Sequence, residues 1–222
     1  MADRVAKAAL FDGLVTAAKA LASGRRAEIV DILAQGERPV EEIATEIEQT
    51  VANTSQHLQQ LLRAGLVRTR RVGNRIYYAL ADEGVAELWA MLRSVAADHV
   101  AEIERLATDY LGDRRQLHTV TRAELTRRLR HRDVVVLDVR PTAEYRAGHV
   151  AGALSAPIDE LTHKIQDLPP DADIIAYCRG PYCVYADQAV RTLTRRGRRA
   201  ARLEDGYPEW ARAGLPVNTL PN

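Results

Sequence analysis

Two cysteines, Cys178 and Cys183, are the side chains of this 222-residue chain best suited to covalent chemistry, and only four residues separate them. The apolar run Ile174–Tyr177 precedes them, and a helical pattern begins near Val184. Where a strand leads through a tight loop into a helix, backbone N–H groups gather around the first loop residue and lower the pKa of a thiol there. The pattern therefore predicts a thiolate nucleophile at Cys178. An inert thiol at the end of a core strand is the alternative.

The cellular compartment decides what two neighbouring thiols can do. No uncharged run approaches the roughly 18 apolar residues of a membrane span, and Asp12 and Lys19 interrupt the apolar N-terminal region where a signal peptide needs an unbroken core. We therefore expect a cytoplasmic protein, in which reactive or metal-binding thiols are better interpretations than a structural disulfide. The 31 Lys and Arg residues nearly cancel the 30 Asp and Glu residues, so the net charge of +1 neither requires nor excludes a nucleic-acid partner.

A change of pattern along the chain predicts two domains. The length alone, at roughly 150 residues per domain, allows one or two. Apolar residues recur at helical spacing from Met1 to about Leu111, whereas from about His118 short apolar runs alternate with helical stretches. We expect domains at residues 1–112 and 113–222, joined around Gly112. The near-continuous apolar runs of the second half are typical of a parallel sheet with helices on its faces.

The first half is predicted to be mainly helical with one β-hairpin. Apolar residues at i, i+3, i+4 spacing predict four short helices, centred on 8–15, 29–33, 40–47 and 58–62. Two β-type runs between Leu66 and Leu80 meet at Gly73-Asn74, a hairpin turn signal. A long helix is predicted from about Asp82 to Leu111. Its apolar stripe is too long for so small a domain to cover, which favours a homodimer interface shared with the first helix.

Helix, turn, helix and hairpin is the layout of a winged helix-turn-helix, in which the second helix of the pair enters the major groove. The reading helix is expected over Thr50–Arg63, whose first turns carry polar groups for base edges and phosphates. The hairpin arginines suit phosphates or the minor groove. A solvated helix face beside an ordinary basic hairpin is the alternative. The candidate DNA-binding residues are Thr50, Asn53, Thr54, Ser55, Gln56, His57, Gln59, Arg68, Arg70, Arg71 and Arg75.

The run Thr50–Leu58, the following Leu-Leu-Arg-Ala-Gly-Leu-Val and the arginine-rich hairpin resemble the ArsR family of dimeric bacterial repressors, over about residues 18–95. The resemblance implies a homodimer bound to an inverted-repeat operator in double-stranded DNA. Metal sensors of that family carry cysteine in the first helix of the pair, whereas 40–47 has no thiol here. Asp98 and His99 point about 100° apart on a helix and make a poor ligand pair. We expect no metal site and no cofactor.

Three motifs of the second half resemble the signatures of the rhodanese family, in the family's order, over about residues 115–217. They are 137–153, the Cys178–Cys183 loop and 204–216. The resemblance implies sulfur transfer, in which a thiolate attacks the outer sulfur of a donor and carries it as a persulfide to a thiol acceptor. On this basis Cys178 is the nucleophile, and N–H groups of the loop hold the persulfide's charge. The candidate catalytic residues are Cys178, Arg179, Gly180, Pro181, Tyr182, Cys183, Asp138 and Arg140.

The roles of individual residues around the loop differ. Asp138 and Arg140 end a predicted strand and are expected near the loop, where ion pairing of Arg140 with Glu144 is as good an interpretation as direct catalysis. Related phosphatases and arsenate reductases use a loop one residue longer that ends in arginine, whereas Val184 stands there, which disfavours oxyanion hydrolysis. Cys183 occupies the last loop position, which disfavours thiosulfate as donor. Cys183 could take up sulfur from Cys178, form a disulfide or polysulfide with it, or only pack the loop.

The sequence thus predicts a mainly α winged helix-turn-helix with a β-hairpin wing, followed by an α/β rhodanese-like domain with a parallel sheet. We interpret the chain as a DNA-binding transcriptional regulator of the repressor type, whose second domain forms a cysteine persulfide and senses or transfers sulfane sulfur from a small-molecule or persulfide donor. A working sulfurtransferase with an attached regulatory domain is the first alternative. A DNA-binding module with a degenerate interaction domain is the second.

Overall fold

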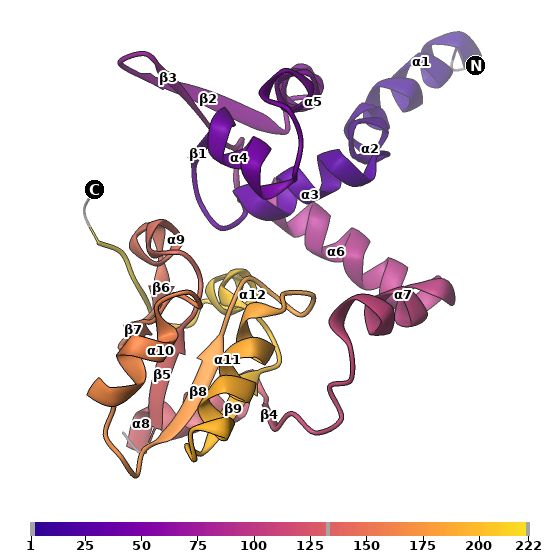
Figure 1. Ribbon diagram of the computed structural model, residues 1–222. Coiled ribbons are helices and arrows are strands. Elements are labelled where there is room, and N and C mark those ends of the chain that lie inside the picture. The colour runs from indigo at the N-terminus through magenta and orange to yellow at the C-terminus, as the bar shows by residue number, and fades with distance from the viewer. Residues whose placement is uncertain (1–2, 132–133, 221–222) are drawn as a thin grey trace. The chain divides into compact units, whose positions relative to one another are not determined.

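The chain divides into two units, Met1–His99 and Val100–Asn222 (Figure 1). The computed structural model describes residues 3–131 and 134–220. Residues 1 and 222, the outer ends of the two predicted domains, lie outside this range, and the limits 1–112 and 113–222 remain predictions. Among the described residues, no helix is long and apolar enough to cross a membrane.

The first unit is built of helices and one small antiparallel sheet. Its elements are α1 (Arg4–Leu14), α2 (Thr16–Leu21), α3 (Gly24–Leu33), β1 (Arg38–Pro39), α4 (Val40–Glu46), α5 (Val51–Arg63), β2 (Val67–Val72), β3 (Arg75–Leu80) and α6 (Glu83–His99). The sheet order is β1-β3-β2. The turn between β2 and β3 contains Gly73 at φ +58°, a conformation that glycine adopts without strain. The predicted hairpin is therefore confirmed.

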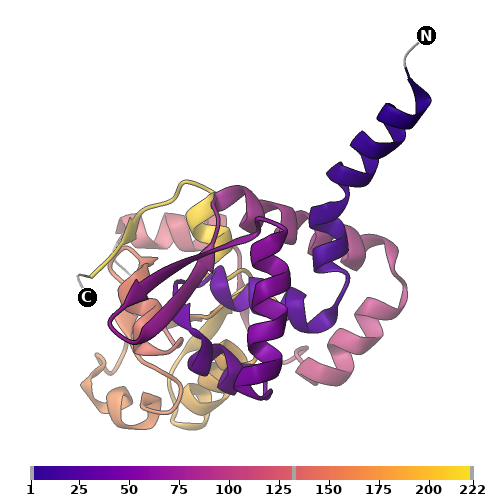
Figure 2. The same ribbon diagram turned by 90° about the horizontal axis from the view of Figure 1, so that it is seen from above.

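The core of this unit forms where the apolar stripes of α3, α4 and α5 meet. Ile29, Ile43, Leu58 and Leu61 are fully buried there. The Thr50 hydroxyl accepts a hydrogen bond from the Asn53 N–H and so caps α5. In contrast, α1 buries no residue, and in Figure 2 it extends away from the other helices of its own unit. The predicted first helix is in fact two, because α1 ends at Leu14 and α2 begins at Thr16.

The single long helix expected from Asp82 to Leu111 is also wrong. α6 ends at His99, and a second helix, α7 (Glu102–Leu111), begins after Ala101. Asp98, His99 and Val100 are consecutive residues of low helix propensity. The acidic side chains of Glu102 and Glu104 in the first turn of α7 favour a new helix N-terminus.

The second unit is a parallel sheet between helices. After α7 it contains β4 (Thr119–Val120), α8 (Arg122–His131), β5 (Val134–Asp138), α9 (Thr142–Ala147), β6 (His149–Val150), β7 (Leu154–Ser155), α10 (Leu161–Lys164), the 3₁₀ turn η1 (Ile165–Asp167), β8 (Asp173–Tyr177), α11 (Tyr185–Arg195), β9 (Ala200–Leu203), α12 (Tyr207–Arg212) and β10 (Val217–Asn218). The sheet order is β4-β9-β8-β5-β7, and every pairing is parallel. β6 and β10 form a separate antiparallel pair.

Helices cover both faces of this sheet. Side chains of α10 and α11 pack with Leu137 and Ala176 on one face, and side chains of α8 and α12 pack with Val136 and Ile175 on the other. Figure 1 shows α11 lying across β8 and β9. Because β8 is the middle strand and α11 follows it, the loop between them lies at the carboxyl edge of the sheet, where α/β folds place their ligand sites.

Candidate functional site

The cysteine loop connects the buried end of β8 to the first turn of α11. Cys178 is only 1% exposed and belongs to the core on the α10–α11 face. Its Sγ lies 3.9 Å from the Gly180 carbonyl oxygen and 3.7 Å from the Cys183 carbonyl oxygen. The Cys183 N–H donates to the same Gly180 oxygen at 3.2 Å and closes the turn. Pro181, Tyr182 and Cys183 are half-buried. The first cysteine is therefore enclosed, and the second lies nearer the solvent.

The pKa values of the two thiols are shifted in opposite directions. Burial raises the pKa of Cys178 well above its ordinary value, and a hydrogen bond to Cys183 acts in the same direction. The pKa of Cys183 is lowered, first because the Cys178 thiol donates a hydrogen bond to it and further by the N–H groups of Arg179 and Tyr185. The N–H groups of Ala186 and Gly180 oppose the rise at Cys178 but do not overcome it. The expected lowering of the pKa of Cys178 is wrong for the closed loop, because burial outweighs the N–H groups.

The turn before α12 presses directly on the cysteine loop. A Cβ atom at Gly206 would lie 2.2 Å from the Gly180 nitrogen and 2.3 Å from the Arg179 carbonyl carbon, which is a clash with backbone on both counts. The next residue, Tyr207, donates its N–H to the Cys178 carbonyl oxygen at 3.0 Å. The motif 204–216 therefore acts on the loop by close backbone packing, which only glycine permits at position 206.

The guanidinium group of Arg179 forms an ion pair with Glu144 rather than a direct contact with the thiols. Its guanidinium contacts the Glu144 carboxylate, with Nε and Nη2 at 2.9 and 2.6 Å from Oε1, and it also lies over the Tyr185 ring, 5.4 Å from the centroid. Glu144 is buried at the first turn of α9. The loop is thus held to α9 by an ion pair, and Arg179 lowers the pKa of Cys183 only as a nearby charge.

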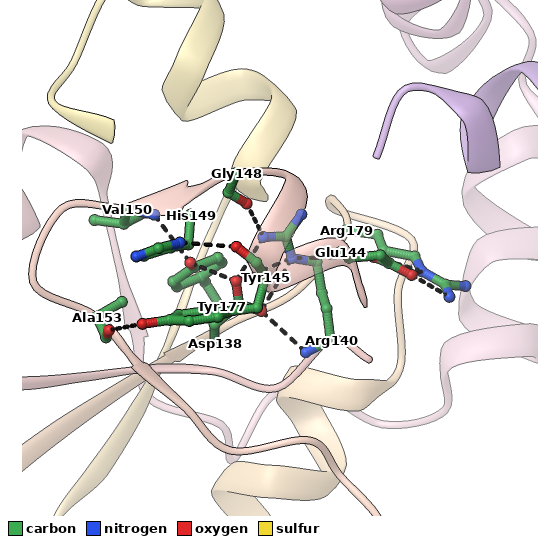
Figure 3. Close-up of polar contacts among 10 residues, drawn as sticks. All are labelled: Asp138, Arg140, Glu144, Tyr145, Gly148, His149, Val150, Ala153, Tyr177 and Arg179. Atoms are coloured by element: carbon green, nitrogen blue, oxygen red, sulfur yellow. Dashed lines mark hydrogen bonds and ion pairs between the residues drawn. The ribbon is translucent and has the colours of Figure 1, made fainter. Parts of the chain in front are cut away.

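Asp138 and Arg140 form a buried network beneath the loop (Figure 3). Both side chains are fully buried, and the guanidinium Nη2 lies 2.5 Å from Asp138 Oδ2. The Tyr177 hydroxyl donates to the same carboxylate at 2.6 Å and accepts from the Val150 N–H at 3.0 Å. Arg140 also donates to the Gly148 carbonyl oxygen at 2.6 Å. The described polar contacts of the Asp138 side chain are with the buried Arg140 and Tyr177, which favours the ion-pairing interpretation over direct catalysis.

The predicted ion pair of Arg140 with Glu144 leaves out the main partner of Arg140. Glu144 lies 4.0 Å from Arg140 Nε and makes its shorter contacts with Arg179. Asp138 is the main partner of Arg140. Burial raises the pKa of the Tyr177 hydroxyl, and the Asp138 charge adds to the rise, so Tyr177 remains a neutral donor. A chain of contacts therefore runs from Asp138 through Arg140 and Glu144 to the first residue after Cys178.

The predicted DNA-reading helix presents most, but not all, of its candidate residues to solvent. Asn53, Gln56 and Gln59 are exposed, and Ser55 and His57 are half-buried. Thr54 is fully buried, and its hydroxyl donates to the Thr50 carbonyl oxygen at 3.0 Å. Its side chain therefore cannot reach DNA, and the prediction for Thr54 is wrong because the residue lies on the same helix face as Leu58 and Leu61.

The hairpin presents arginines, but the guanidinium groups of three of the four form local hydrogen bonds. Arg70 forms a two-pronged contact with Glu37 and lies over the Tyr77 ring, and Arg71 donates to the Gly73 carbonyl oxygen at 3.0 Å. Arg68 donates through Nε to the Leu80 carbonyl oxygen at 3.2 Å and, like Arg75, is exposed.

Among the described residues of the first unit, none covers an apolar surface on α1 and α6. α6 packs on α3 through Trp89, which donates to Asp31 at 2.6 Å, and through Arg93, which contacts the same carboxylate at 3.0 Å. Apolar side chains elsewhere on α6 and along α1 are exposed. They are Val5, Leu10, Phe11, Leu14, Leu88, Met91, Leu92 and Val95.

In residues 3–131 and 134–220, no group of three or more His, Cys, Asp or Glu side chains could hold a metal ion.

Comparison with known proteins identifies both halves of the chain. Residues 23–69 match the family model "Bacterial regulatory protein, arsR family", and residues 121–213 match "Rhodanese-like domain". The HTH-type transcriptional regulator Rv0324 of Mycobacterium tuberculosis is 49% identical over 212 residues, which cover 96% of this chain and 93% of that protein. The chain belongs to the ArsR-family transcriptional regulators that carry a rhodanese-like domain. Both family resemblances and the fold class predicted from the sequence are confirmed.

Two other proteins resemble one half of the regulator each. A sulfurtransferase of Allochromatium vinosum is 35% identical over 86 residues, which cover 38% of this chain and 78% of that protein. The solution structure of the homodimeric winged helix-turn-helix DNA-binding domain of Mb0332 from Mycobacterium bovis is 48% identical, with a TM-score of 0.42, and covers 46% of the regulator and 93% of that chain.

Sequence reasoning missed three residues that shape the site. Tyr177 ends the apolar run of β8, where a tyrosine is expected to be a core residue. Gly206 lies in a turn, where glycine is common for reasons unrelated to a functional site. Arg114 lies 64 positions before Cys178, yet it donates to two carbonyl oxygens of the loop. No local pattern announces such a contact, because it depends on how distant segments pack.

Proposed function

We propose that the regulator is a cytoplasmic, homodimeric repressor that binds double-stranded operator DNA and senses sulfane sulfur as a persulfide on Cys178. The observation that carries the proposal is the pairing of two thiols in the loop between β8 and α11, where the N–H groups of Gly180 and Ala186 face the Cys178 sulfur. Such N–H groups favour an anionic sulfur. The half-buried Cys183 supplies a second sulfur in hydrogen-bond contact.

The thiol pair supports a balanced loading step. Cys178 donates its proton to the Cys183 thiolate as its sulfur attacks the outer sulfur of a donor R–S–SH. The S–S bond of the donor breaks, and the donor leaves as the thiolate RS⁻. The outer-sulfur proton passes to the departing RS⁻, so the products are RSH, a neutral thiol on Cys183 and an anionic persulfide on Cys178. One negative charge is present before and after the step. Cys183 thus acts as the base that compensates for the raised pKa of Cys178.

DNA recognition is assigned to α5 and the hairpin. Asn53, Gln56 and Gln59 are exposed on the first turns of α5, where a recognition helix contacts base edges. Arg68 and Arg75 are suited to phosphates. The exposed apolar surface of α1 and α6 supports a homodimer, because association of two copies would remove that surface from water.

The test is DNA binding with and without sulfur loading. A duplex selected from a random-sequence library by the wild-type protein serves as the operator, and its Kd is measured by gel shift for reduced and sodium tetrasulfide-treated protein. We expect treatment to change the Kd of the wild type and to leave that of Cys178→Ser unchanged. Mass spectrometry should find added sulfur on Cys178. An unchanged Kd with loaded Cys178, together with catalytic turnover of the donor, favours the sulfurtransferase alternative. Absence of any adduct favours a degenerate domain.

A further inference from the structure

Arg114 reaches the cysteine loop from the segment 112–118 that leads from α7 to β4. Its guanidinium makes three hydrogen bonds within the second unit. Nη1 donates to the Pro181 carbonyl oxygen at 2.7 Å, Nη2 donates to the Cys183 carbonyl oxygen at 3.1 Å, and Nε donates to Asp187 Oδ2 at 2.5 Å. A single side chain from a segment distant in sequence thus holds two peptide groups of the loop and the first turn of α11.

The far end of this contact is anchored in the interior. Asp187 is 1% exposed, and the guanidinium of Arg202 on β9, also buried, lies 2.9 Å from its second carboxylate oxygen. Two cations therefore share one buried carboxylate, which fixes the position of Arg114 much better than a surface ion pair would. Arg202 Nη2 lacks a hydrogen-bond partner among the described residues. On the side of the loop, Arg114 is the cation that pairs with Asp187.

One carbonyl oxygen connects Arg114 to the reactive sulfur. The Cys183 oxygen accepts from Arg114 and also lies 3.7 Å from Cys178 Sγ, in the position of an acceptor for the thiol proton. A persulfide has no proton on Sγ and carries its charge on the outer sulfur. The thiol contact is then lost, and the carbonyl oxygen faces added negative charge. Because the peptide group is planar, turning this oxygen away rotates the whole Cys183–Val184 peptide and withdraws it from Arg114.

We propose that Arg114 is a positioning residue that couples sulfur loading of Cys178 to the segment 112–118. The inference rests on the proposed function and specifies its regulation. In the reduced state Arg114 holds the segment against the loop. In the loaded state the bond to the Cys183 oxygen breaks, and the segment is held less tightly, because Arg114 keeps only its contacts with Pro181 and Asp187. The chain continues from this segment directly into α7, so this loosening changes the restraint on the helix that precedes it.

The segment carries its own reporters of this loosening. The Arg115 N–H donates to Asp113 Oδ1 at 2.9 Å, and the Leu117 N–H donates to the Arg114 carbonyl oxygen at 2.9 Å. Both hydrogen bonds lie within the segment that carries Arg114. Hydrogen–deuterium exchange of these amides therefore reports on whether the segment is held, independently of any effect on DNA.

The experiment uses the full chain treated with sodium tetrasulfide, with exchange followed in peptides covering 112–118 and Cys178 loading followed by mass spectrometry. In the wild type, loading should raise exchange roughly tenfold, the effect of losing one hydrogen bond to a charged group. In Arg114→Ala, exchange should be fast before treatment and should not change on loading. Arg114→Lys keeps the charge and one bond, and it should restore part of the difference. Arg115→Ala is the matched control, because Arg115 is exposed and its ion pair is with Asp113, outside the cysteine loop.

The outcomes separate the two proposals. If Cys178 takes up no sulfur, the proposed function fails. If wild-type Cys178 is loaded but exchange in 112–118 is unchanged, the role of Arg114 is refuted while persulfide formation stands. The same holds if Arg114→Ala and Arg114→Lys both respond as the wild type does. Arg114→Lys also guards against a folding defect, because it retains a cation beside Asp187.

Discussion

Replacing Asp138 by asparagine should destabilise the rhodanese-like domain. Asp138 and Arg140 are both fully buried, 2.5 Å apart at their closest atoms. Asparagine has nearly the same shape as aspartate but carries no charge. Asp138→Asn therefore leaves the Arg140 cation in the interior without its main counter-ion, and it also weakens the acceptor of the Tyr177 hydroxyl.

The expected loss follows from the burial of the pair. Removing one partner of a buried ion pair costs about 3–5 kcal/mol. The lower end applies here, because Glu144 still lies 4.0 Å from Arg140. With a denaturant dependence of about 2 kcal/mol per molar urea, a loss of about 3 kcal/mol lowers the urea midpoint by about 1.5 M.

Tryptophan fluorescence can follow this domain alone. The chain has two tryptophans, and Trp210 on α12 is buried in the core. In a Trp89→Phe background, Trp210 reports only on the rhodanese-like domain during urea unfolding. Adding Arg140→Met to Asp138→Asn removes the stranded cation, so the double variant should recover part of the loss, as a double-mutant cycle would show.

The matched control is Asp109→Asn on α7, whose ion pair with Arg105 is exposed on both sides. That substitution should leave the midpoint where it is, because exposed pairs contribute little. The reasoning is refuted if Asp138→Asn lowers the midpoint by less than about 0.5 M, since a loss near 1 kcal/mol is that of an ordinary hydrogen bond.

Three further predictions concern the loop and the hairpin. Gly206→Ala places a methyl group on the loop backbone, so we expect a domain destabilised by about 3 kcal/mol or a displaced loop, measured by urea unfolding and by alkylation of the cysteines. Because the Cys178 thiol lowers the pKa of Cys183, Cys178→Ala should move the midpoint of Cys183 alkylation with iodoacetamide to higher pH, and an unmoved midpoint would contradict the hydrogen bond. Arg75→Ala should reduce the slope of log K against log salt by about 0.9 per protomer, or about 1.8 for the bound dimer. Arg70→Ala should reduce it less, since Glu37 already neutralises that charge. Equal slopes would argue against this distinction.

Apolar patterns that extend over several residues identified the longer elements. The stripes of α3, α4 and α5 and the runs of β5 and β8 were recognisable because each repeats over several residues. Strands of two residues, such as β6 and β10, have no period and exist only through their pairing partners. The end of α6 coincides with three consecutive residues of low helix propensity, 98–100. This signal was missed in the sequence because apolar residues continue at helical spacing as far as Leu106.

The candidate site divides in the same way. The order of strand, cysteine loop and helix was readable, since it is local. The burial of Thr54 was also within reach, because Thr54, Leu58 and Leu61 recur at i, i+4 and i+7. The pKa directions of the two cysteines were not, because they depend on how deeply packing encloses Cys178.

The enclosure of Cys178 affects the rate at which a donor can react with the thiol, rather than the affinity for the donor. A donor molecule reaches a side chain that is 1% exposed only when the loop opens. At low donor concentration, the loading rate is then the product of an opening equilibrium and the rate at an open thiol, as in the exchange of a buried amide. Each 1.4 kcal/mol of opening free energy slows loading about tenfold. The response time of a regulator that is loaded in this way therefore depends on how tightly Gly206 packs against the loop. A change in that packing would alter the loading rate and leave the sulfur chemistry the same.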